Sequence, residues 1–247
     1  TDELVAAVKG LGERPELPRK AVSTQRSLVG ETSAMQEVRV LIERIAPTPA
    51  TDLIEGETGT GKELVARMLH EQSGRKGPFI PVNCSAIAPD LLESDLFGHT
   101  RGAFTSASRM REGLFLAAGG GTLFLDEINE MRLDMEVKLL RTLEENTIRP
   151  VGSDREIPVD CRIVASTQAD LAGLVAEQRF REDLYYRLNV IRIAVPPLRK
   201  RRDDIPLLAT HFVEQLSAEI GVQPIELGDA QLEELQAHHW PGNVREL

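Results

Sequence analysis

Apolar residues follow two alternating patterns along the chain from Leu28 onward. Short apolar runs of strand length lie at 53–54, 79–82, 122–125, 162–165 and 190–195. Longer stretches with apolar residues at helical spacing lie at 35–45, 63–71 and 135–144. Strands that alternate with helices are typical of a parallel sheet covered by helices on both faces. The pattern therefore predicts an α/β fold with a mostly parallel sheet.

The strand-like runs stop after the paired prolines at 196–197. Two aspartates and a proline within 203–206 then predict a helix start. Apolar side chains that would share one face of this helix follow, namely Ile205, Leu208, Phe212, Leu216 and Ile220. A second helix is predicted at 229–239, and 244–247 has the character of a helix that the chain does not complete. We expect a small, truncated helical subdomain here.

The first residues differ from the rest of the chain. Leu4, Val5 and Val8 have helical spacing, which fits either the last helix of an upstream domain or a short frayed helix. Residues 11–27 carry two prolines among charges and few large apolar groups, as linkers do. The predicted segments are a helix end with a linker at 1–27, an α/β subdomain at 28–197 and a helical subdomain at 198–247.

Composition and charge narrow the class of protein. Hydrophobic residues make up 41%, enough for a globular core. The net charge of -10 repels phosphate backbones, so we expect DNA contact only through a domain absent from this chain. Cys84 and Cys161 lie in apolar stretches without metal-type spacing, as buried thiols do. No apolar run approaches the ~20 residues that cross a bilayer, and we expect a cytoplasmic protein without membrane contact.

A glycine-rich segment connects the first strand-like run to the helix at 63–71. It consists of Gly56, Glu57, Thr58, Gly59, Thr60, Gly61 and Lys62. Glycines let backbone N–H groups turn toward a polyphosphate, the helix N-terminus adds partial positive charge, and Lys62 reaches the terminal phosphates. The spacing alone arises by chance in roughly one chain in twelve of this length, so the flanking strand and helix carry the assignment.

The residue after this lysine departs from the general pattern. Ser or Thr usually stands there and binds Mg²⁺ through its hydroxyl, whereas this chain has Glu63. We therefore expect Mg²⁺ to be held through water and other carboxylates. The apolar run at 122–125 ends in Asp126 and Glu127, which such a strand would place beside the glycine-rich segment. Asp126 would position Mg²⁺ and Glu127 would polarise the attacking water. Solvated acidic caps of a strand are the alternative.

Two arginines are candidates for a charge supplied to the phosphates of a neighbouring subunit. Ring-forming ATPases use such an arginine finger, and Arg181 and Arg187 lie six residues apart. The alternative is a surface helix in which Glu182 or Asp183 pairs with Arg187. Periodicity alone does not decide between them.

Together these motifs resemble the central AAA+ domain of bacterial enhancer-binding proteins, the activators of sigma-54 RNA polymerase. The resemblance runs from about Leu28 to the last residue, and its segments are GETGTGKE, DLFGHTRGAFTSA, GGTLFLDE, FREDLYYRLNV and WPGNVREL. It implies a P-loop ATPase with ATP and Mg²⁺, sigma-54 RNA polymerase holoenzyme as partner, and self-association into a ring, with a hexamer expected. Glu63 is also what this family shows after its lysine.

The resemblance also implies roles for individual residues. Asn83 would hold the catalytic glutamate in a nucleotide-dependent switch, with a backbone cap at the strand end as the alternative. Thr167 is similar to the sensor of the terminal phosphate. Arg181 and Arg187 correspond to the intersubunit arginines, with Arg187 as the finger. Arg245 is similar to the lid arginine that contacts nucleotide.

A further segment resembles the GAFTGA loop that touches sigma-54 when ATP is bound. It consists of Gly102, Ala103, Phe104, Thr105, Ser106 and Ala107. Ser106 replaces the second glycine and restricts the backbone where a positive φ is expected. Leu114 and Leu116 stand where many relatives have Arg and Glu, which indicates either a variant relay of the nucleotide state or a subgroup with apolar packing.

Three hypotheses about function follow. The first is an ATP-driven remodeller of the closed sigma-54 promoter complex. The alternative, which Ser106 keeps open, is an AAA+ regulatory module that assembles but does not remodel sigma-54. The third is another AAA+ machine that acts on proteins, which the GAFTSA segment disfavours.

Overall fold

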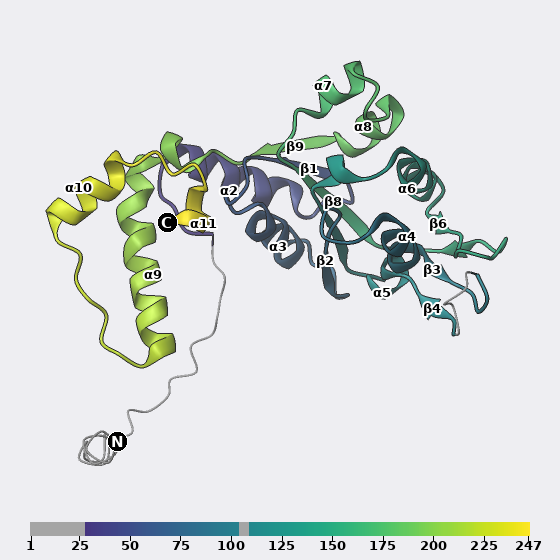
Figure 1. The fold of residues 1–247 in the computed structure, drawn as a ribbon, viewed down its shortest axis with the longest axis horizontal. Helices are drawn as coiled ribbons and strands as arrows, with labels where there is room; N and C mark the ends of the chain where they lie inside the picture. Colours follow the sequence, from purple (N-terminus) through teal and green to yellow (C-terminus); the bar gives the residue numbers. More distant parts are fainter. Residues whose placement is uncertain (1–27, 104–108) are drawn as a thin grey trace, which may run out of the picture.

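A five-stranded parallel sheet forms the centre of the molecule (Figure 1). The computed structural model describes residues 28–103 and 109–247. The strands, in the spatial order β2-β5-β8-β1-β9, are β1 (Asp52–Glu55), β2 (Phe79–Asn83), β5 (Thr122–Asp126), β8 (Arg162–Thr167) and β9 (Ile191–Ala194). Each corresponds to one of the strand-like runs of the sequence, and all neighbouring pairs are parallel. The α/β prediction is confirmed.

Helices cover both faces of this sheet. One face packs against α2 (Ser33–Ile45) and α3 (Lys62–Gln72), and the other packs against α4 (Pro89–Phe97), α5 (Leu114–Ala117), α6 (Leu133–Glu145), α7 (Leu171–Ala176) and α8 (Glu182–Leu188). Successive strand residues point to opposite faces. In β5, Leu123 and Leu125 pack with the second group of helices, whereas Phe124 packs with α2 and α3. Burial on both faces explains why the strands read as continuous apolar runs.

Two short hairpins were not predicted. They pair β3 (Gly98–His99) with β4 (Arg111–Glu112), and β6 (Thr147–Ile148) with β7 (Ile157–Pro158). Strands of two residues are too short to show an alternating pattern. The β3–β4 hairpin leads into the segment at 104–108, which lies outside the described residues.

The C-terminal residues form the helical lid subdomain, at one end of the molecule in Figure 1. Its elements are the 3₁₀ turns η2 (Leu198–Lys200) and η3 (Arg202–Asp204) and the helices α9 (Ile205–Ile220), α10 (Asp229–Ala237) and α11 (Asn243–Glu246). Ile205 and Leu208 pack on Trp240, but Leu216 is 57% and Ile220 71% exposed. The predicted apolar face is therefore buried only over the first half of the helix. A helix of this length spans about 24 Å, which exceeds the small core beneath it.

Asp204 connects the lid to the α/β subdomain. The predicted helix start is confirmed, because Asp204 is the N-cap residue of α9. Its carboxylate makes no capping hydrogen bond to α9, however, and accepts hydrogen bonds from Glu31 N at 2.6 Å, Thr32 N at 2.9 Å and Thr32 Oγ1 at 2.8 Å. These donors precede α2, so the residue caps a helix of the other subdomain. The contact joins residues more than 170 positions apart.

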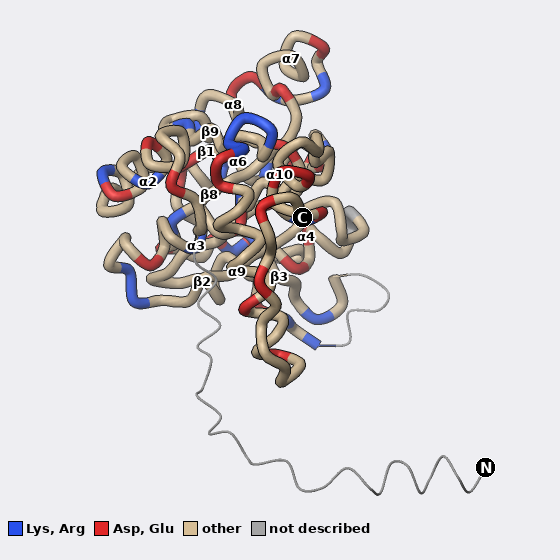
Figure 2. Tube along the Cα trace, turned by 90° about the vertical axis from the view of Figure 1, so that its left-hand side faces the viewer, with Lys and Arg blue, Asp and Glu red and all other residues tan. Residues whose placement is uncertain are grey.

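Charged side chains of both signs are interspersed along the chain (Figure 2).

Cys84 is buried, Cys161 is half-buried, and both are free thiols. Among the helices of the described ranges, none combines the length and the apolar character that a membrane span needs.

A buried ion pair joins the first residues of β1 and β8. Arg162 Nη2 lies 2.8 Å from Asp52 Oδ2, and both side chains are at most 1% exposed. The same guanidinium donates to the carbonyls of Ile45 and Ala46 at the end of α2. Burial raises the pKa of Asp52 to about 6, although Arg162 opposes this shift.

We expect Arg162→Met to lower the free energy of unfolding by about 3–5 kcal/mol at pH 7, because it leaves the Asp52 carboxylate buried without a partner. Without Arg162 the pKa of Asp52 rises further above 6, so the folded variant takes up its proton at a higher pH than wild type. The deficit should therefore shrink as the pH falls toward about 6 and stay constant below 6, where wild type takes up the same proton. Urea denaturation at several pH values measures both effects. Adding Asp52→Asn should recover part of the loss. A deficit below about 1 kcal/mol would contradict the prediction.

Candidate functional site

The glycine-rich segment, called the P-loop below (residues 56–62), leads from β1 into the first residue of α3. Gly59 and Gly61 have left-handed φ angles of 79° and 103°, which side chains other than glycine rarely adopt. A cavity of about 230 Å³ opens at the N-terminus of α3. It is lined by Thr58, Gly59, Gly61, Lys62, Glu63, Asp126, Glu127, Val244 and Arg245. The fold thus brings together the P-loop, the acidic pair and the lid arginine.

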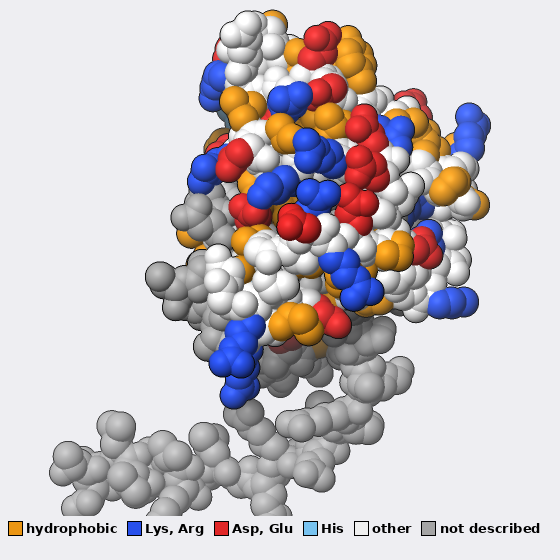
Figure 3. All heavy atoms as spheres, turned by 90° about the vertical axis from the view of Figure 1, so that its right-hand side faces the viewer, with side chains coloured by type: hydrophobic (Ala, Val, Ile, Leu, Met, Phe, Trp, Pro, Cys, Tyr) orange, Lys and Arg blue, Asp and Glu red, His pale blue; other side chains and the backbone are white. Residues whose placement is uncertain are grey.

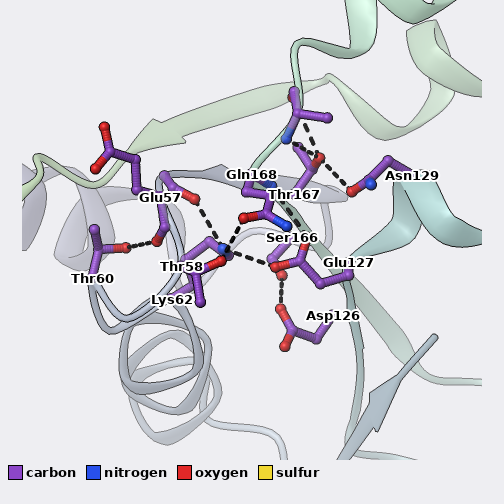
Figure 4. A network of polar contacts seen from close by, with 12 residues as sticks. Glu57, Thr58, Thr60, Lys62, Asp126, Glu127, Asn129, Ser166, Thr167 and Gln168 are labelled. Carbon is purple, nitrogen blue, oxygen red and sulfur yellow. Dashed lines mark hydrogen bonds and ion pairs between the residues drawn. The ribbon is translucent and has the colours of Figure 1, made fainter. Parts of the chain in front are cut away.

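Lys62 is the buried cation of this cavity (Figure 4). Its Nζ donates to Gly56 O at 2.9 Å and lies 3.2 Å from Glu127 Oε1. Glu127 follows β5 with a left-handed φ of 53°, a strained conformation for a residue with a side chain. Its other carboxylate oxygen accepts from Gln168 N at 3.4 Å. The ammonium group and the catalytic candidate are therefore held in contact.

Asp126 lies beside them at the end of β5. Its Oδ1 accepts a hydrogen bond from Ser166 Oγ, a residue that the sequence analysis missed (Figure 4). Asn83 Nδ2 lies 3.4 Å from Asp126 Oδ2. The Oδ1 of Asn83 accepts from Ser85 N at 2.9 Å and Ala86 N at 3.2 Å. Asn83 thus caps the backbone after β2 and contacts Asp126 in this structure, and its switch role toward Glu127 stays a prediction.

Thr167 ends β8, and its hydroxyl faces away from the cavity lining. It donates to Asn129 Oδ1 at 2.8 Å and accepts from Ala169 N at 3.0 Å. The next residue, Gln168, instead reaches the P-loop, where it accepts a hydrogen bond from Thr58 Oγ1. The sensor role of Thr167 stays a prediction. Only the position of Gln168 at a strand end could have indicated its contact.

Two glutamates of the P-loop region have different surroundings. Glu63 lines the cavity, and its Oε1 lies 2.8 Å from Arg67 Nη2 one turn further along α3. Glu57 instead contacts the lid, where its oxygens accept from both terminal nitrogens of Arg199 at 2.6 and 2.5 Å. Hydrogen bonding from Arg199 lowers the pKa of Glu57 to about 2. Thr60 Oγ1 donates to Glu57 O at 2.8 Å and stabilises the turn.

The candidate finger arginines lie at α8, apart from the residues that line the cavity. Arg181 precedes the helix and pairs with Asp183, with Nη2 2.6 Å from Oδ2. Arg187 Nη2 donates to Leu143 O at the end of α6, at 2.7 Å. Asp183 thus pairs with Arg181 and not with Arg187, in contrast to the pair considered above. The finger role stays a prediction.

The base of the GAFTSA segment lies at the end of the molecule opposite the lid (Figure 1). Gly102 is exposed with a φ of 82°, and Ala103 N donates to Thr100 O at 3.2 Å. Residues 104–107 lie outside the described ranges. Basic and acidic side chains lie close together on this end, as Figure 3 shows. Lys138 on α6 pairs with Glu93 on α4, and Arg149 pairs with Glu156.

The residues present fit a nucleoside triphosphate with Mg²⁺. Lys62 and Arg245 supply positive charge, the left-handed glycines free the backbone at the start of α3, and Asp126 supplies a carboxylate for a hard cation. The lid closes the cavity on one side, because Val244 N donates to Gly59 O at 3.0 Å.

Comparisons with known proteins agree with this site. A family model described as "Sigma-54 interaction domain" matches residues 28–194, and one described as "AAA+ ATPase lid domain" matches residues 199–247. The response regulator protein PilR of Pseudomonas aeruginosa is 50% identical over 99% of this chain and 55% of its own length. The transcriptional regulatory protein ZraR of Escherichia coli is 50% identical over 91% of this chain and 51% of its own. The chain spans about half the length of these relatives.

Solved structures show the same fold. The crystal structure of NtrX from Brucella abortus in complex with ATP has a TM-score of 0.83, with 39% identity over 99% of this chain and 50% of that one. The complex of the same protein with ADP has a TM-score of 0.82, with 42% identity over 90% of this chain and 48% of that one. The chain therefore belongs to the sigma-54 interaction domain family, as the AAA+ domain with its lid that sigma-54-dependent transcriptional activators contain.

Proposed function

We propose that this chain is the ATP-hydrolysing motor of a sigma-54-dependent activator and drives the closed promoter complex to the open form. The supporting observation is the single cavity that unites Lys62, the Asp126–Glu127 pair and Arg245. The nucleotide complexes of the similar NtrX support ATP as the ligand. DNA contact would belong to parts of the protein outside this chain.

The reaction is the attack of water on the terminal phosphate of ATP, which yields ADP and phosphate. Lys62 would bind the terminal phosphate oxygens, and Glu127, held 3.2 Å from Lys62, would take the proton of the attacking water. Mg²⁺ held by Asp126 would neutralise charge on the phosphate oxygens. Arg245 would contact the nucleotide from the lid.

Self-association would complete each site. Transfer of the phosphoryl group requires positive charge at the leaving phosphate, which an arginine finger can supply. The half-buried Arg181 directly before α8 and the exposed Arg187 within it do not line the cavity of their own chain, which fits a contribution to a neighbour's site. We therefore propose a ring, as a hexamer, with Arg187 as the finger.

Phe104→Ala tests the contact with sigma-54. We expect the variant to keep its ATPase activity, because the loop base and the nucleotide cavity lie apart in the fold. It should lose capture of sigma-54 in the presence of ADP and aluminium fluoride, measured by gel filtration or pull-down with purified sigma-54. Leu91→Ala, an exposed apolar residue on α4 at the same end of the molecule, is the control. Capture by Phe104→Ala at the wild-type level would remove this loop as the contact.

The alternative is an AAA+ regulatory module that assembles without remodelling sigma-54, and Ser106 is the residue that favours it. Ser106→Gly removes the restriction on a positive φ and should keep or improve capture. Capture by Ser106→Gly together with none by wild type would identify the natural chain as the non-remodelling form. Conversion of a closed sigma-54 promoter complex to an open one by wild type with ATP would exclude it.

A further inference from the structure

The outer side of the P-loop is held by the C-terminal subdomain. Three consecutive carbonyl oxygens of the P-loop accept hydrogen bonds from it, each at 3.0 Å: Thr58 O from Asn243 Nδ2, Gly59 O from Val244 N, and Thr60 O from Arg201 Nη2. Arg201 and Asn243 are at most 2% exposed. Both donor side chains are therefore shielded from water.

Such contacts determine where the phosphate-binding groups of the loop point. A peptide unit is planar and trans, so the C=O of one residue and the N–H of the next point in opposite directions. Fixing the carbonyls of Thr58 and Thr60 on the lid side therefore turns the N–H groups of Gly59 and Gly61 to the opposite side. Both glycines line the cavity, and backbone N–H groups of this kind cradle phosphates.

Asn243 is the residue on which these contacts converge. It is fully buried, with a left-handed φ of 53°. Its Oδ1 accepts from Leu198 N at 2.8 Å, and its Nδ2 donates to Thr58 O and, at 3.2 Å, to Glu57 Oε2. One side chain thus joins the start of the lid, its last helix and the P-loop.

The backbones of the two subdomains also meet here. A Cβ placed on Gly59 would lie 2.2 Å from Gly242 O, so only glycine permits this approach. Next to it, Glu57 accepts from both Arg199 and Asn243. The P-loop therefore contacts the lid both through the Glu57 side chain and through its backbone carbonyls.

We propose that Asn243 is a positioning residue for nucleotide binding, which holds the P-loop from the lid in its phosphate-binding conformation. This inference rests on the proposed ATPase function and adds a residue to it. Movement of the lid away from the P-loop breaks several of these hydrogen bonds together. Lid position and phosphate affinity are then coupled, and the coupling is reciprocal.

Asn243→Asp removes the Nδ2 hydrogen-bond donor with little change in the shape of the side chain. The carboxylate still accepts from Leu198 N, but it meets Thr58 O and the Glu57 carboxylate with an acceptor instead of a donor. We expect the full chain to bind ADP and ATP about ten-fold or more weakly, because a buried acceptor loses its partner. At saturating ATP, kcat should change less than about three-fold, since Lys62, Asp126 and Glu127 are untouched.

Asn146→Asp is the matched control. Asn146 is also left-handed, with a φ of 52°, but it is exposed at the end of α6 and does not line the nucleotide cavity. Titration of ADP by calorimetry should give the wild-type affinity for this variant. Hydrogen exchange of the P-loop amides without nucleotide should be faster in Asn243→Asp and unchanged in Asn146→Asp.

Rescue distinguishes positioning from general damage. Adding Glu57→Gln to Asn243→Asp removes one of the two facing carboxylates and supplies an amide donor, so ADP affinity should recover several-fold. Arg199→Gln, at an exposed ion pair that does not affect the core, should weaken ADP binding about two- to five-fold even if Asn243→Asp does not fold.

Wild type must bind and hydrolyse ATP in the same experiment. If Asn243→Asp then binds ADP as tightly as wild type, the positioning role alone is overturned. If Asn243→Asp does not fold, the same result in Arg199→Gln overturns it. Failure of wild type to bind nucleotide would overturn the proposed function, and this inference with it.

Discussion

Glu127→Gln is expected to bind ATP about as tightly as wild type and to hydrolyse it at least about 10²-fold more slowly, the usual contribution of a general base. Glutamine has nearly the shape of glutamate, so the contact with Lys62 Nζ at 3.2 Å can persist. What it lacks is the negative charge that takes a proton from water. Phosphate release measures turnover, and a fluorescent nucleotide measures binding.

Lys62→Ala, in contrast to Glu127→Gln, should lose tight binding of ATP, because it removes the buried ammonium group of the cavity. Lys76→Ala, the same change at an exposed position beyond α3, should leave both binding and turnover at the wild-type level. Equal loss of nucleotide affinity in Lys62→Ala and Glu127→Gln would mean that the two roles are assigned wrongly.

For Arg187→Ala we expect a loss of ATPase activity of about 10³-fold or more with unchanged nucleotide affinity, because a finger acts on the transition state in a neighbour's site. In its own chain Arg187 donates to Leu143 O and does not line the cavity. Mixing the variant with Glu127→Gln should restore activity. In such rings some sites receive Glu127 from one subunit and Arg187 from the next.

Arg179→Ala is the control, since Arg179 is an exposed arginine that precedes α8 and pairs with Glu177. It should keep its activity alone and in mixtures. If Arg187→Ala binds ATP poorly and no mixing ratio restores turnover, Arg187 belongs to the site of its own subunit.

The amino-acid sequence by itself determined the sheet, the P-loop and the acidic pair at the end of β5. These features depend on local properties: continuous apolar runs for strands buried on both faces, glycines where φ is positive, and carboxylates directly after a strand. The parallel arrangement then placed Asp126 and Glu127 beside Lys62, since the carboxyl ends of parallel strands share one edge. Neither short hairpin could be predicted in this way, because strands of two residues are too short to show an alternation of apolar and polar side chains.

Only the tertiary structure decided how the lid meets the P-loop. Asp204 starts α9 as predicted, but its carboxylate binds the residues that precede α2. Glu57 contacts Arg199, and the buried Asn243 joins three segments. Periodicity likewise gave α9 an apolar face, yet it does not say that the core ends before Leu216. The contacts of Asn243 with the P-loop join residues 185 and 186 positions apart. Their formation depends on the relative position of two packed subdomains, which no local pattern of residues encodes.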